Sequence, residues 1–68
     1  MNIQSAVLKG TKILKSRCIK TAQLDAEILM ARVLSANREY IILNNNKYLE
    51  EQNFENFKKL IKERANRK

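Results

Sequence analysis

The chain has 68 residues and carries 14 Lys and Arg against seven Asp and Glu, which gives a formal net charge of +7. Hydrophobic residues make up 44% and charged residues 31%, which excludes an intrinsically disordered chain and allows one small core. The single cysteine and the lack of histidine exclude a disulfide-stapled scaffold, a Cys–His catalytic pair and a Cys–His zinc site. Because there is no proline and only one glycine, the composition predicts an all-α fold.

Apolar residues recur at helical spacing over residues 3–15, and Asn2 precedes them as the expected N-cap. The apolar face of this helix comprises Ile3, Ala6, Val7, Gly10, Ile13 and Leu14. A glycine inside a helix costs about 1 kcal/mol relative to alanine. We expect a neighbouring helix to approach Gly10 closely and so to offset this cost; a hinge at Gly10 is the alternative.

Residues 22–34 predict a second helix, with Thr21 as its N-cap. Its apolar residues spread around most of the circumference; they are Leu24, Ile28, Met30, Ala31, Val33 and Leu34. A helix that is apolar on nearly all sides is packed on several sides. The second helix is therefore expected to form the centre of the domain.

Asn37 can cap a short third helix over residues 38–43, whose buried face would come from Tyr40, Ile41 and Leu43. A loop follows, and the last helix is expected over residues 50–66. Its apolar stripe comprises Phe54, Phe57, Leu60, Ile61 and Ala65. We expect Phe57, in the middle of the stripe, to pack against the second helix. The sequence thus predicts a small bundle of four principal helices in a single domain, residues 1–68, with the second helix central.

Candidate catalytic carboxylates occur as two pairs, Asp25 with Glu27 and Glu50 with Glu51. All four lie near the N-terminal ends of predicted helices, where the helix dipole favours negative charge. We interpret them as structural rather than as general acids and bases. With one glycine, the chain also cannot form a glycine-rich phosphate loop.

No apolar run approaches the roughly 18 residues of a membrane span, and the N-terminus lacks the apolar region of a signal peptide. We expect a soluble, cytoplasmic monomer that does not associate with membranes. Cys18 is interpreted as passive, and Tyr40 and Tyr48 as half-buried anchors rather than catalytic phenols. The residues themselves predict no catalytic, cofactor-binding or metal-binding site.

The positive charge gathers at the two ends of the chain. The net charge is +5 over residues 1–20, −3 over residues 21–55 and +5 over residues 56–68. If the fold brings residues 9–20 near residues 58–68, a single positive patch forms. Such a patch would bind nucleic acid weakly, without sequence preference and with strong dependence on salt. A solvated charged surface is the alternative interpretation.

Four segments together, residues 7–14, 24–34, 38–43 and 57–65, resemble in order the N-terminal domain of peptide chain release factor glutamine methyltransferases of the HemK (PrmC) type. The resemblance spans nearly the whole chain. One departure is Ala22 after Thr21, where family members often have proline. This change keeps the N-cap and loses only the rigid first residue of the helix.

The resemblance implies a fragment, because the family continues into a Rossmann-like domain with a glycine-rich S-adenosylmethionine loop and an Asn-Pro-Pro-Tyr motif. It implies that the whole protein transfers a methyl group from S-adenosylmethionine to the glutamine of a Gly-Gly-Gln loop in release factors. It also implies that the helical domain helps to recognise the release factor and is inactive alone, without its own cofactor. Two alternatives remain: a free-standing basic module for RNA or the ribosome, and a small protein-interaction domain with no enzyme attached.

Overall fold

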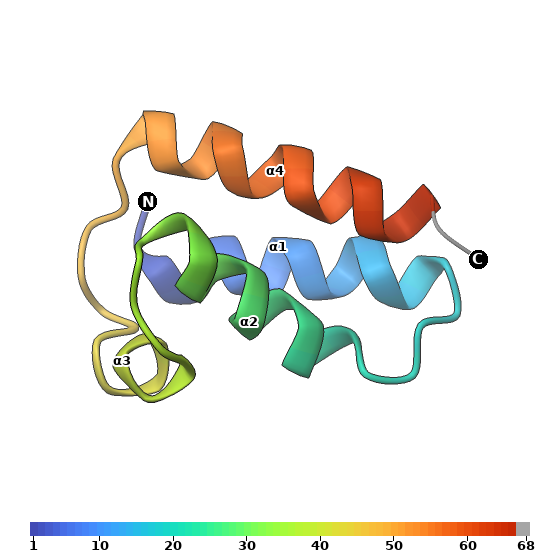
Figure 1. The fold of residues 1–68 in the computed structure, drawn as a ribbon, viewed down its shortest axis with the longest axis horizontal. Coiled ribbons are helices and arrows are strands. Elements are labelled where there is room, and N and C mark those ends of the chain that lie inside the picture. Colours follow the sequence, from blue (N-terminus) through green and yellow to red (C-terminus); the bar gives the residue numbers. More distant parts are fainter. Residues whose placement is uncertain (67–68) are drawn as a thin grey trace.

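The computed structural model describes residues 1–66, which form four helices: α1 (Ile3–Ser16), α2 (Ala22–Val33), α3 (Arg38–Leu43) and α4 (Glu51–Asn66). Figure 1 shows α1 and α4 running in the same direction, with α2 running back across them and α3 at one end. The small all-α bundle is confirmed, and α2 is central in that it contacts each of the other three helices. Arg67 and Lys68, which belong to the predicted basic end, lie outside the described residues.

Two helices begin at the predicted side-chain caps. The side-chain oxygens of Asn2 and Asn37 each accept a hydrogen bond, at 2.8 Å, from the backbone N–H three residues later. Each bond satisfies one N–H that has no partner inside the helix. At the start of α2 the prediction of a side-chain cap is wrong. The hydroxyl of Thr21 donates to the carboxylate of Asp25 at 3.0 Å and caps no backbone group.

The connection between α3 and α4 returns to the start of α1. Backbone carbonyls of Lys47 and Asn45 accept hydrogen bonds from the first two N–H groups of α1, at 3.0 and 2.9 Å. The N–H of Leu49 donates to the carbonyl of Met1 at 2.9 Å, and the Leu49 side chain is buried. These bonds place the start of α4 beside the start of α1, which explains why the two helices run in the same direction.

The ends of α1 and α2 share one kind of turn. Cys18 and Ser35 have left-handed backbones, with φ of 62° and 54°. In each turn the N–H of the next residue donates to the carbonyl five residues before it, at 3.2 and 2.8 Å. This pattern satisfies a carbonyl of the last helical turn and usually has glycine at the left-handed position. The two turns therefore hold non-glycine residues in a conformation that costs about 1–2 kcal/mol.

The core is densest where α4 crosses Gly10 of α1. The largest fully buried side chains are Phe57, Leu14, Met30 and Ile61. A Cβ atom added to Gly10 would lie 2.7 Å from Cζ of Phe57 and 2.9 Å from Cδ1 of Ile61. The predicted close approach of a helix to Gly10 is confirmed, and that helix is α4. Phe57 is buried as predicted, but its ring lies against Gly10 of α1, and its packing against α2 stays a prediction.

The buried face of α2 is narrower than the sequence predicts. Leu24 and Ile28 are 38% and 40% exposed, so α2 is not covered on all sides. The buried residues of α2 are mostly small, namely Ala22, Ala26, Met30 and Ala31. Small side chains let a helix touch several neighbours closely, and of the larger apolar residues of α2 Met30 is buried whereas Leu24 and Ile28 are left at the surface.

The helix α3 and the loop after it bury less than expected. Only Ile41 of α3 is buried, whereas Tyr40 is 37% and Leu43 is 80% exposed. Tyr48 is 74% exposed, so its interpretation as a half-buried anchor is wrong. A helix of fewer than two turns that packs mainly on α2 can cover only the side chains on one side.

Candidate functional site

Two surfaces of different chemistry flank α4. A pocket between α2 and α4 carries both positive and negative side chains. A groove between α1 and α4 has lysines as its only charged lining residues. Both surfaces combine side chains that are far apart in the sequence, so each is a product of the fold.

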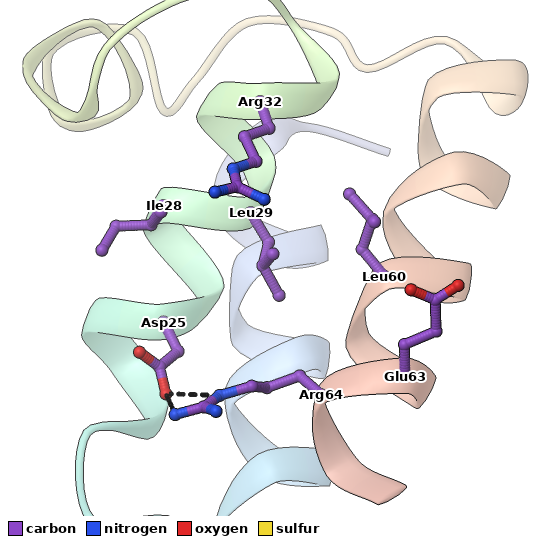
Figure 2. Close-up of a pocket in the computed structure, with 7 residues that line it drawn as sticks. All are labelled: Asp25, Ile28, Leu29, Arg32, Leu60, Glu63 and Arg64. Atoms are coloured by element: carbon purple, nitrogen blue, oxygen red, sulfur yellow. Dashed lines mark hydrogen bonds and ion pairs between the residues drawn. The ribbon is translucent and has the colours of Figure 1, made fainter. Parts of the chain in front are cut away.

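The pocket between α2 and α4 has a volume of about 260 Å³. It is lined by Asp25, Ile28, Leu29, Arg32, Leu60, Glu63 and Arg64 (Figure 2). Figure 2 shows Leu29 and Leu60 projecting into the space between the two helices, with charged side chains around them. The pocket therefore has an apolar centre and a mixed-charge rim.

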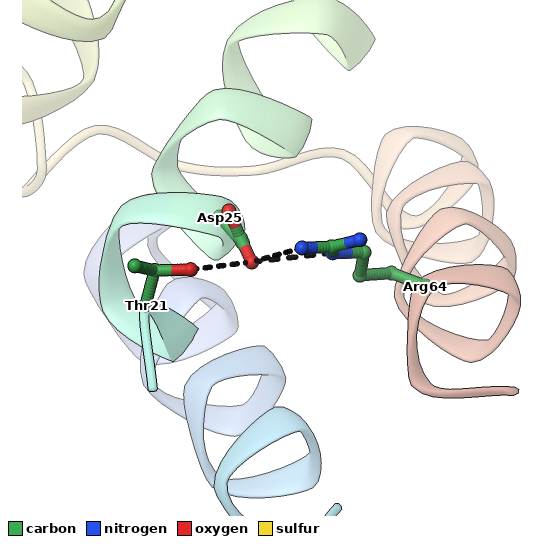
Figure 3. A network of polar contacts seen from close by, with 3 residues as sticks. All are labelled: Thr21, Asp25 and Arg64. Atoms are coloured by element: carbon green, nitrogen blue, oxygen red, sulfur yellow. Dashed lines mark hydrogen bonds and ion pairs between the residues drawn. The ribbon is translucent and has the colours of Figure 1, made fainter. Parts of the chain in front are cut away.

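Two charged residues of this rim, Asp25 and Arg64, form a polar network with Thr21. Oδ2 of Asp25 accepts hydrogen bonds from Oγ1 of Thr21 at 3.0 Å and from Nε and Nη2 of Arg64 at 3.2 and 3.1 Å (Figure 3). The Asp25 side chain is only 17% exposed. Charge-assisted bonds of this kind are the stronger ones in proteins. The network ties the first turn of α2 to the last turns of α4, and Oδ2 of Asp25 finds its hydrogen-bond donors within the domain.

The neighbouring carboxylate has its own arginine. Oε1 of Glu27 lies 2.9 Å from Nε of Arg38, and its side chain is 13% exposed. The first pair of candidate carboxylates, Asp25 and Glu27, therefore links α2 to α4 and to α3. The sequence places both near the start of a helix, but it does not reveal partners that lie 39 and 11 residues away. The second pair, Glu50 and Glu51, is exposed at the start of α4.

We call the surface between α1 and α4 the lysine groove. It is lined by Lys9, Gly10, Ile13, Phe54, Phe57, Lys58, Ile61 and Lys62, and it has a volume of about 250 Å³. Phe57 and Ile61 are fully buried beneath it, whereas Ile13 is 39% exposed and Phe54 is partly exposed. The ammonium groups of Lys9 and Lys58 lie 5.8 and 5.2 Å from the centroid of the Phe54 ring, within the range of cation–π contacts.

The two basic ends of the chain meet in part at the lysine groove. The fold brings Lys9 of the first end together with Lys58 and Lys62 of the second. Two other lysines of the first end line other surfaces. Lys15 lines a groove formed by α1, α2 and α3, and Lys20 lies beside the start of α2. The fold therefore brings part of the two basic ends together, and nucleic-acid binding stays a prediction.

Cys18 is exposed in the turn after α1, and its passive role stays a prediction. Within residues 1–66, no group of three or more acidic or cysteine side chains is arranged to hold a metal ion. Over the same residues, every helix is too short or too polar to cross a membrane.

The chain is similar in sequence to known proteins. The family model for the PrmC N-terminal domain matches residues 5–68. The chain is 30% identical, over 67 residues, to a release factor glutamine methyltransferase of Clostridium botulinum (strain Hall). The match covers 98% of this chain and 24% of that relative, so the chain spans about a quarter of the relative's length. No solved structure matches the chain at a comparable level of significance.

Proposed function

The chain belongs to the PrmC N-terminal domain family, and from this premise we propose that it is the recognition domain of a methyltransferase that modifies peptide chain release factors. In this proposal the domain helps to bind and position the release factor and takes no part in the chemistry. The match of residues 5–68 to the family model, together with the similarity to a release factor glutamine methyltransferase, carries the proposal.

The chemistry is assigned to a separate part of the whole protein. In the proposal, a methyl group passes from S-adenosylmethionine to the glutamine of a Gly-Gly-Gln loop. Binding this cofactor calls for a glycine-rich turn that lets the backbone come close to it. The only glycine of the chain, Gly10, lies inside α1 and packs against Phe57 and Ile61, so the described residues do not fit the cofactor. No catalytic or cofactor-binding residue is therefore assigned within the chain.

The arrangement of the domain suits recognition. Some of its charged side chains cross-link helices, as Asp25 and Glu27 do, and others stand at the rims of open surfaces. Partly exposed apolar side chains lie next to those rims, as Ile13 does in the lysine groove. Protein interfaces combine an apolar centre with a polar rim in the same way.

Two titrations test the proposal. Calorimetry of the chain with S-adenosylmethionine should give no binding heat, and titration with unmethylated release factor should give weak, saturable binding. A one-to-one isotherm with the cofactor in the micromolar range would place a cofactor site within these helices and contradict the proposal. Tight binding to one RNA that persists at high salt would favour an RNA-binding module in its place.

The gene offers an independent test. A reading frame that continues beyond codon 68 into a glycine-rich loop and an Asn-Pro-Pro-Tyr motif supports the proposal. A natural stop codon at that point supports a free-standing module.

A further inference from the structure

We propose that the lysine groove binds an acidic segment of a partner protein, and that an apolar side chain of this segment rests on Ile13. The inference goes beyond the proposed function, because it specifies the chemistry of the bound segment whichever protein carries it.

The floor of the groove provides an apolar contact. Phe57 and Ile61 fill the space beneath it and are 1% exposed each. Since Gly10 has no side chain, α4 sits close to α1, and Ile13 lines the groove above these buried residues. Ile13 is 39% exposed, and removing its exposed part from water on binding is favourable, roughly in proportion to the apolar area covered.

The rim of the groove is positive. All three of its charged residues are lysines, and α1 carries no acidic residue anywhere along its length. Lys58 is partly neutralised by Glu55, whose carboxylate lies 3.4 Å away. Among the ion pairs of residues 1–66, none involves Lys9 or Lys62. These two ammonium groups stand on opposite walls, so a carboxylate-bearing segment laid along the groove complements both.

The aromatic ring favours a peptide over a nucleic acid. Proteins that bind single-stranded nucleic acid combine a positive groove with aromatic rings on which the bases stack. The only partly exposed ring of the groove, that of Phe54, already lies beneath the ammonium groups of Lys9 and Lys58. The rest of the open floor is aliphatic. Such a surface accepts an apolar side chain more readily than a stacked base.

A fluorescein-labelled amphipathic peptide, with glutamate along one face and leucine along the other, serves as the probe. Its binding to the chain is followed by fluorescence anisotropy. Lys9→Glu combined with Lys62→Glu reverses the charge of one lysine on each wall of the groove. The matched control, Lys12→Glu combined with Lys59→Glu, changes the net charge equally on the same two helices but outside the groove. Circular dichroism verifies that each variant keeps its helical content.

We expect the groove variant to bind the peptide about tenfold more weakly than the unchanged chain, and the control to lose less than about threefold. Ile13→Gln, which keeps all charges, should also weaken binding. Equal losses in the groove variant and the control would show that net charge alone attracts the peptide and would overturn the proposal. The proposal would also be overturned if binding of single-stranded oligouridylate depended on Lys9 and Lys62 and binding of the peptide did not. Neither result bears on release factor binding, which is measured separately.

Discussion

Replacing Gly10 by alanine tests the closest contact in the core. At an exposed helical position this change stabilises a protein by about 1 kcal/mol, because alanine has the higher helix propensity. Here the new methyl carbon would lie 2.7 Å from Cζ of Phe57 and 2.9 Å from Cδ1 of Ile61. Carbon atoms pack best at about 3.5–4.0 Å, so both side chains must move by about 1 Å.

The cost of this movement outweighs the gain in propensity. Phe57 and Ile61 are both 1% exposed, so neither can shift into solvent. Overpacking a core by one methyl group costs about 1–3 kcal/mol. Subtracting the propensity gain, we expect Gly10→Ala to lower the free energy of unfolding by about 1 kcal/mol. In a domain of this size, that loss lowers the melting temperature by about 4–8 °C.

Thermal unfolding followed by far-ultraviolet circular dichroism measures the effect. A double-mutant cycle with Phe57→Leu identifies its cause, since leucine lacks the ring atoms nearest to the added methyl group. Phe57→Leu should destabilise the unchanged chain and should cost less, or nothing, in the Gly10→Ala background. If Gly10→Ala alone raised the melting temperature, the helices would not be in tight contact at Gly10 and this account of the core would be refuted.

Three further changes test other parts of the fold. Phe57→Ala removes the largest buried side chain and should lower the free energy of unfolding by about 3–5 kcal/mol. Because this is most of the stability of a domain this small, circular dichroism should show a largely unfolded chain at physiological temperature. Ser35→Gly relieves a left-handed non-glycine residue and should raise stability by about 0.5–1 kcal/mol in urea unfolding; no gain would mean that the turn is not strained. Asp25→Asn weakens the network with Arg64 and should lower the free energy of unfolding by about 1 kcal/mol, and by less at high salt. The control Glu39→Gln changes a residue outside any ion pair of residues 1–66 and should alter the free energy of unfolding little. Equal effects of these last two changes would show that the network contributes nothing.

The sequence predicts the parts of the fold that depend on local chemistry. Asn2 and Asn37 mark helix starts because their side chains bond to the backbone three residues later, a relation within one turn of chain. Gly10 and Phe57 are predictable because helical periodicity places them on apolar faces. The same periodicity overestimates burial, as Leu24 and Leu43 show, because it gives the apolar residues of a helix without the number of neighbours that cover them.

The candidate sites depend on contacts that no local pattern contains. Asp25 and Arg64 are 39 residues apart, and their ion pair exists only because α2 and α4 pack together. In the same way, the sequence shows that both ends of the chain are rich in lysine and arginine. It does not show that Lys9 and Lys62 line the same groove, because this follows from the packing of α4 over Gly10. Thr21 illustrates a competition between two local partners. Its hydroxyl could have capped the first turn of α2, but it donates to the carboxylate of Asp25 instead.

The central claim, that this domain contributes recognition and not chemistry, can be measured in the Clostridium botulinum relative. Three forms of that enzyme are compared: the unchanged protein, one that lacks the region matched by this chain, and one in which residues 1–68 of this chain replace that region. The account predicts that removal raises KM for intact release factor about tenfold, leaves turnover of a short Gly-Gly-Gln peptide unchanged, and is reversed at least in part by the replacement. Equal KM values for release factor in all three forms, or loss of peptide turnover on removal, would contradict it.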